Sequence, residues 1–70
     1  MKQSTICKIC ACERFELEKD GFVLNDVTFS NNTKCWFYLH QNGNRITIEL
    51  NLNINVMRVF KNSLIIKEVR

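Results

Sequence analysis

The sequence predicts an all-β fold, a five-stranded antiparallel meander that forms one small domain over residues 1–70. Branched aliphatic residues alternate with polar ones over residues 46–56, which is the period of a strand with one buried face. Asn42 and Gly43 lie between two apolar segments, and an Asn-Gly pair in this setting is the strongest short-range signal for a hairpin. The chain has no proline and no low-complexity linker, so we expect no domain boundary within it.

The central hairpin has a register that follows from a two-residue turn on Asn42 and Gly43. This turn opposes apolar residues on the inner face: Leu39 to Ile46, Phe37 to Ile48 and Cys35 to Leu50. Trp36 and Tyr38 then point outward, opposite polar residues of the next strand. A shift by one residue would turn every side chain to the other face, so the register decides which residues are buried.

The N-terminal segment, residues 5–17, is interpreted as the first strand. A three-residue loop that ends in Gly21, with this glycine in the left-handed conformation, joins it to the second strand. The alternative is an α+β fold with a helix over residues 4–19, where a helical wheel brings four apolar side chains together: Ile6, Ile9, Cys10 and Leu17. Glu13 falls within that apolar stripe and Phe15 lies opposite it, which favours the strand.

The last strand is expected from Leu64 to Val69, after a turn near residues 60–63. A sheet of this size with one apolar face and no helix must cover that face. The sheet either curls into a small barrel or stacks on a second copy as a dimeric sandwich, and a homodimer follows in the second case.

Length and charge exclude several classes of protein. A chain of 70 residues has little room for an enclosed site beside its core. The net charge is +3, and the whole excess lies in residues 58–70, so a nucleic-acid partner is less favoured than a protein.

No apolar run is long enough to span a membrane and no signal peptide is visible, so we expect a cytoplasmic protein with reduced thiols.

The four cysteines, Cys7, Cys10, Cys12 and Cys35, are candidates for a zinc site together with His40. On regular strands, Cys7 and Cys10 point to opposite faces, as do Cys35 and His40. The sequence therefore predicts no metal and no other cofactor. The single histidine lies opposite Arg45, which makes a poor general base, and we expect no enzymatic activity.

The outward face of the central hairpin is the predicted partner-binding surface, with Trp36 and Tyr38 as anchors and Arg45, Asn51 and Asn53 around them. Aromatic side chains are common anchors at interfaces, and amides offer donors and acceptors.

These residues favour a non-catalytic protein–protein interaction module: a regulator, inhibitor or assembly subunit of the kind found among phage and mobile-element products. A binder of single-stranded nucleic acid or nucleotides is the first alternative, and a cysteine-based zinc module is the second.

Overall fold

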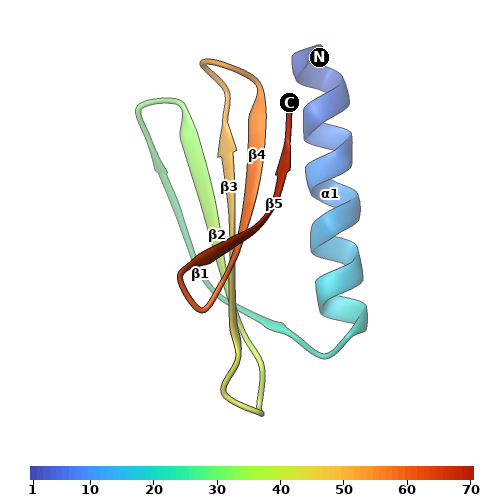
Figure 1. Cartoon of the computed structure of the whole chain (residues 1–70), viewed down its shortest axis with the longest axis vertical. Coiled ribbons are helices and arrows are strands. Elements are labelled where there is room, and N and C mark those ends of the chain that lie inside the picture. Colours follow the sequence, from blue (N-terminus) through green and yellow to red (C-terminus); the bar gives the residue numbers. More distant parts are fainter.

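A computed structural model describes residues 1–70 as one helix packed on one open antiparallel sheet (Figure 1). The elements are α1 (Gln3–Lys19), β1 (Val23–Ser30), β2 (Thr33–Leu39), β3 (Arg45–Asn51), β4 (Val56–Lys61) and β5 (Leu64–Val69). The strands lie in chain order, β1-β2-β3-β4-β5, so a five-stranded antiparallel meander is confirmed. Its strands are not all the predicted ones, because the predicted first strand is a helix and the segment over residues 46–56 divides between two strands. The fold is nevertheless α+β rather than all-β, and the sheet does not close into a barrel.

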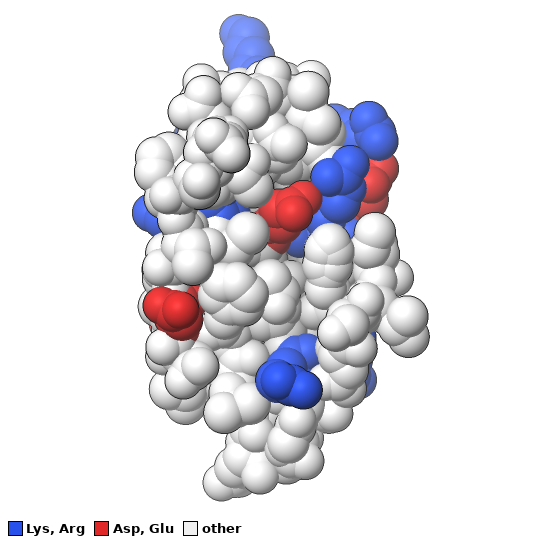
Figure 2. Space-filling model, turned by 90° about the vertical axis from the view of Figure 1, so that its left-hand side faces the viewer, with Lys and Arg blue, Asp and Glu red and all other residues white.

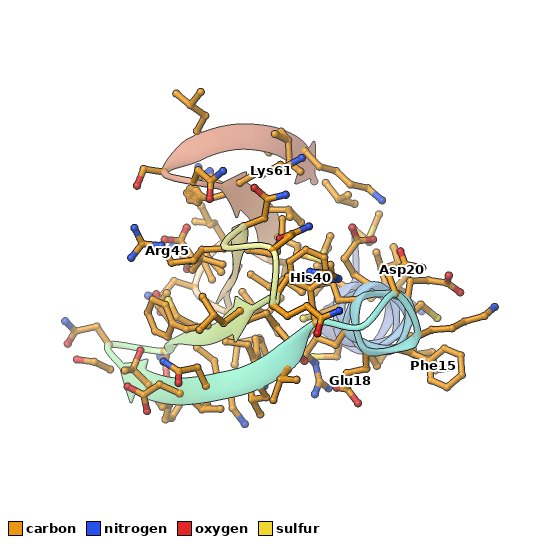
Figure 3. The ribbon with its side chains drawn as sticks, turned by 90° about the horizontal axis from the view of Figure 1, so that it is seen from below. Phe15, Glu18, Asp20, His40, Arg45 and Lys61 are labelled. Carbon is orange, nitrogen blue, oxygen red and sulfur yellow. The ribbon has the colours of Figure 1, made fainter.

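The predicted N-terminal strand is wrong, because this segment is the helix α1. Ile6 and Cys10, one turn apart, are 0% and 1% exposed where the helix meets the sheet. Glu13 lies at the edge of this apolar stripe, and its charge is compensated there because its carboxylate accepts a hydrogen bond from Lys67 Nζ at 3.0 Å. Phe15 points away from the sheet into solvent (Figure 3). The helix is not long and apolar enough to cross a membrane.

Gly21 ends the helix instead of turning a hairpin. Its φ of +92° is the left-handed conformation that glycine adopts without strain. The N–H of Gly21 donates to the carbonyl of Glu18, and the N–H of Phe22 donates to the carbonyl of Leu17. This pair of bonds is the Schellman motif that closes a helix C-terminus. A left-handed glycine was therefore correctly expected here, but in a different structure.

The central hairpin differs from the prediction by one residue. β2 and β3 pair Trp36 with Ile48 and Phe37 with Thr47. The loop is longer than two residues, because His40 N–H donates to the carbonyl of Asn44 and Gly43 N–H donates to the carbonyl of His40. Gly43 alone in this loop has a positive φ, of +93°, which fits a three-residue loop with a bulge at glycine and not the two-residue turn that needs two such residues.

This shift turns every β2 side chain over, so the predicted inner positions of Cys35, Phe37 and Leu39 are wrong. Trp36 and Tyr38 face the helix instead and are 6% and 2% exposed. Both aromatic side chains contact charged side chains of α1. The guanidinium of Arg14 lies 4.5 Å from the Trp36 ring centroid, and the Tyr38 hydroxyl donates to Glu18 Oε2 at 3.1 Å.

The alternating segment over residues 46–56 is not one strand. β3 ends at Asn51 and β4 begins at Val56, and the four residues between them form a turn in which Asn55 has a φ of +53°. Asparagine tolerates this left-handed conformation better than most residues. The apolar face of β3 does match the prediction: Ile46, Ile48 and Leu50 are all buried.

The core lies between α1 and one face of the sheet. Its buried side chains come from the helix and the three central strands: Ile6, Cys10, Trp36, Tyr38, Ile46, Ile48, Leu50, Met57 and Val59. The helix therefore covers the apolar face that a barrel or a sandwich of two copies was expected to bury.

Candidate functional site

The five residues predicted to bind a partner do not lie together on one surface. Trp36 and Tyr38 are in the core, so their predicted outward orientation is wrong. Arg45 is exposed and begins β3 on the side of the sheet away from α1 (Figure 3). A partner-binding role for Arg45, Asn51 and Asn53 stays a prediction.

Asn51 and Asn53 tie loops together at one end of the sheet. Asn51 Oδ1 accepts the Asn53 N–H at 3.0 Å, and the Asn53 amide donates to the carbonyl of Asn31 at 3.0 Å. Asn53 Oδ1 also accepts from the amide of Asn32 at 3.1 Å. These amides thus join the β3–β4 turn to the β1–β2 turn, a local structural use that the sequence did not reveal.

The outer face, defined as the side of the sheet away from α1, has no element over it. The strand registers place five side chains in one row across it: Asp26, Phe37, Thr47, Phe60 and Ile65. Phe37 and Phe60 both pair with Thr47, from either side, and both are only half-buried. Two phenyl rings therefore flank a small polar residue at the centre of the sheet.

This arrangement leaves a hollow of about 610 Å³ on the outer face. Its lining includes Phe37, Leu39, Arg45, Thr47, Phe60 and Asn62. The volume lies within the range of ligand pockets. Five of its twelve lining residues are hydrophobic, so the lining is more polar than that of a usual ligand pocket. Figure 2 looks onto this face and shows that most of it is uncharged.

The charges on the outer face form a paired group and two single charges, Arg45 and Asp26, which both line the hollow. Arg58 binds Glu49 at 3.0 Å and Glu68 at 2.9 Å, and Glu68 also binds Arg70. Hydrogen bonds from Arg58 and Arg70 hold the pKa of Glu68 below its usual range. Arg45, in contrast, has no acidic partner within salt-bridge distance. An unpaired cation therefore lies at the hollow, beside charges that neutralise one another.

The cysteines are dispersed and all four are free thiols. Cys7 and Cys12 are exposed on α1, and Cys10 is buried on the side of α1 that faces the sheet. Cys35 is half-buried on the outer face. Burial raises the pKa of both the Cys10 and the Cys35 thiols, which disfavours their thiolate forms. No three or more His, Cys, Asp or Glu side chains gather where they could share a metal ion.

His40 packs at the helix end, away from the cysteines. Its ring meets Phe22 edge-on with centroids 4.9 Å apart, and its Nδ1 accepts the Asn42 N–H at 3.1 Å. The histidine thus supports the chain between α1 and β1 and the central hairpin.

A scan against protein-family models, a search of the curated proteins and a search of the solved structures each gave no match to this chain.

Proposed function

We propose that this chain is a small, non-catalytic protein–protein interaction module that binds its partner on the outer face of its sheet. A regulator, an inhibitor and an assembly subunit all fit this description. The observation that carries the proposal is the hollow between Phe37 and Phe60, with the unpaired Arg45 beside it.

The hollow suits a side chain of a protein partner. Phe37 and Phe60 expose part of each ring there, while Thr47 between them is small, so an inserted apolar group would displace water from both rings. Interface anchors of this kind fill pockets near the centre of a contact. Arg45 would pair with an acidic residue next to the inserted group, since arginine readily binds carboxylates in two-pronged contacts.

The proposal is tested with Thr47→Arg, which fills the hollow without touching the core face of β3. The control is Thr33→Arg, which adds the same side chain to the outer face of β2 but outside the hollow. Each tagged variant is used to capture proteins from the native cell, and the affinity for each captured protein is then measured with purified components.

We expect wild type and Thr33→Arg to bind the same partner, and Thr47→Arg to bind it at least about tenfold more weakly, as the loss of an interface anchor does. Circular dichroism must show that all three are folded. Equal affinity of wild type and Thr47→Arg for every captured partner would contradict the proposal.

A binder of single-stranded nucleic acid is the second candidate, because two aromatic rings and an arginine on one sheet face are what base stacking uses. Glu49, Glu68 and Asp26 on the same face weaken it. Fluorescence anisotropy with a labelled oligonucleotide distinguishes the two: affinity that falls steeply between 50 and 200 mM salt, by about 10³-fold or more, would favour nucleic acid.

A further inference from the structure

The two edges of the sheet, β1 and β5, are both free in the single chain, and they differ in how well they are protected (Figure 1). Natural proteins protect free edges with charged side chains, proline or bulges, since an open edge pairs readily with another strand. Along β5, the first half exposes Leu64, Ile65 and Ile66, but the register of β4 and β5 shifts there, between Val59 and Phe60. The second half carries Lys67 and Glu68, and both are held in ion pairs. Along β1, the only charged residue is Asp26.

β1 also exposes apolar side chains beside its free edge. Val27 and Phe29 lie on the helix side of the sheet, opposite Trp36 and Lys34 of β2. They are nevertheless 39% and 61% exposed, because α1 does not cover this edge. Apolar groups that the chain's own fold leaves uncovered next to an open strand are a characteristic of an interaction surface.

The main-chain groups of the same residues point away from β2. In an antiparallel sheet, successive residues direct their N–H and C=O groups alternately to one neighbour and to the other. The N–H of Val27 points to the free side, where it donates to Asp26 Oδ1 at 2.8 Å, so pairing with a second strand must replace this bond. Phe29, two residues further, directs its groups to the same side.

We infer that β1 pairs with β1 of a second copy, in an antiparallel register with Thr28 on the two-fold axis. In this register Val27 faces the partner's Phe29, and Phe29 faces the partner's Val27, so apolar residues meet on the helix side. On the outer side Thr28 meets the partner's Thr28, and Asp26 meets the partner's Ser30. The two sheets join edge to edge into one of ten strands, within the range observed for open sheets.

Neighbouring registers are poorer. A shift towards the start of β1 would oppose Phe29 to Asn25, which lies at the bulge between Leu24 and Asp26. A shift towards its end would oppose Phe29 to itself and Val27 to Asn31, in the turn after the strand. Only the register centred on Thr28 pairs both apolar residues and brings together the main-chain groups that point outward. A two-fold arrangement of one surface with itself closes after two copies and does not extend into a filament.

Pairing of β1 is tested by the oligomeric state of the whole chain, measured by sedimentation equilibrium from roughly 1 µM to 1 mM under reducing conditions. We expect a reversible dimer. Phe29→Lys should weaken it at least about tenfold, because it places a charge against an apolar partner residue. Ile66→Lys is the matched control, since Ile66 is 58% exposed on the other edge strand, and it should change the dimer constant less than about twofold.

The register is tested by cross-linking. Residues directly opposite in a non-hydrogen-bonded antiparallel pair lie about 4.5 Å apart at Cα, which suits a disulfide. Thr28→Cys, in a background carrying Cys7→Ser, Cys12→Ser and Cys35→Ser, should give a covalent dimer with oxidised glutathione. Asp26→Cys in that background should not, because the proposed register sets it opposite Ser30.

A monomer throughout the concentration range would overturn the inference. So would a dimer that Ile66→Lys dissociates and Phe29→Lys does not, since the contact would then lie at β5. Equal cross-linking of Thr28→Cys and Asp26→Cys would exclude the register. Circular dichroism of Phe29→Lys confirms that loss of the dimer is not loss of the fold.

Discussion

The two faces of this sheet are built from the same strands but are used differently. On the covered face, side chains such as Trp36 and Ile48 are at most 6% exposed and pack against α1. On the outer face, their chain neighbours Phe37 and Thr47 are half-buried with nothing over them. Successive residues of a strand alternate between faces, so residues that stabilise the fold and residues of the proposed binding surface are adjacent in the sequence.

This comparison implies that paired substitutions at adjacent residues separate the two roles. A change on the covered face leaves a cavity under the helix and costs folding free energy. A change on the outer face removes little that the fold needs, and its effect appears when a partner binds. The predictions that follow test this division, beginning with the largest effect.

Trp36→Ala should have the largest effect. We expect it to lower the free energy of unfolding by about 3–5 kcal/mol, because a large buried aromatic group and its contact with Arg14 are lost. This is a large share of the roughly 4–10 kcal/mol that a domain of this size has, so Trp36→Phe serves as a milder variant. Urea unfolding followed by circular dichroism measures both.

Phe37→Ala, at the next residue, is the control and should cost only about 1 kcal/mol. The comparison has a clear failing outcome. If Phe37→Ala destabilises the protein more than Trp36→Ala does, then Phe37 is the core residue, and the register with the two-residue turn applies after all.

Much of the sheet could be predicted from the sequence because local patterns specify it. The alternation of Ile46, Ile48 and Leu50 determined the buried face of β3. The register of β2 could not be predicted, since Asn42 and Gly43 suit both a two-residue turn and a three-residue loop with a glycine bulge. The two loops differ by one residue, and that one residue exchanges the faces of Trp36 and Phe37.

The helix was missed for a reason that is not local. Glu13 contradicted an apolar helical stripe until its partner was known, and that partner, Lys67, lies 54 residues further along the chain. The left-handed conformation of Gly21 was predicted correctly, but the element that it belongs to was not, because a helix end and a hairpin both use a left-handed glycine. The hollow on the outer face depends on the β2 register, so it could not be found before the register was.

Tyr38→Phe should have an intermediate effect of about 0.5–1.5 kcal/mol at neutral pH, because it removes the hydrogen bond to Glu18 on the covered side. Burial, and then the neighbouring Glu18, raise the pKa of the Tyr38 phenol above its ordinary value. A raised pKa in the folded state gives stability that is fully present below about pH 10, the unfolded value, and is lost as the pH rises through the folded one.

The unfolding free energies of wild type and Tyr38→Phe should therefore converge as the pH rises above about 10. Taking the difference between the two proteins cancels the contributions of the other titrating groups, which both proteins share. A difference that stays constant up to pH 12 would show that the phenol is not the group involved.

Glu68→Gln, on the outer face, should have the smallest effect. The side chain is exposed to solvent, and exposed ion pairs contribute little. Hydrogen bonds from Arg58 and Arg70 lower the pKa of Glu68, so its contribution is present above the unfolded value of about 4.3 and is lost as the pH falls through the folded one. The wild-type midpoint of thermal unfolding should fall slightly more than that of Glu68→Gln between pH 5 and pH 2, and about 0.5 M salt should reduce the difference. A loss as large as that of Trp36→Ala would mean that the row of Glu49, Arg58 and Glu68 is part of what holds the sheet together, and the division between the two faces would not hold there.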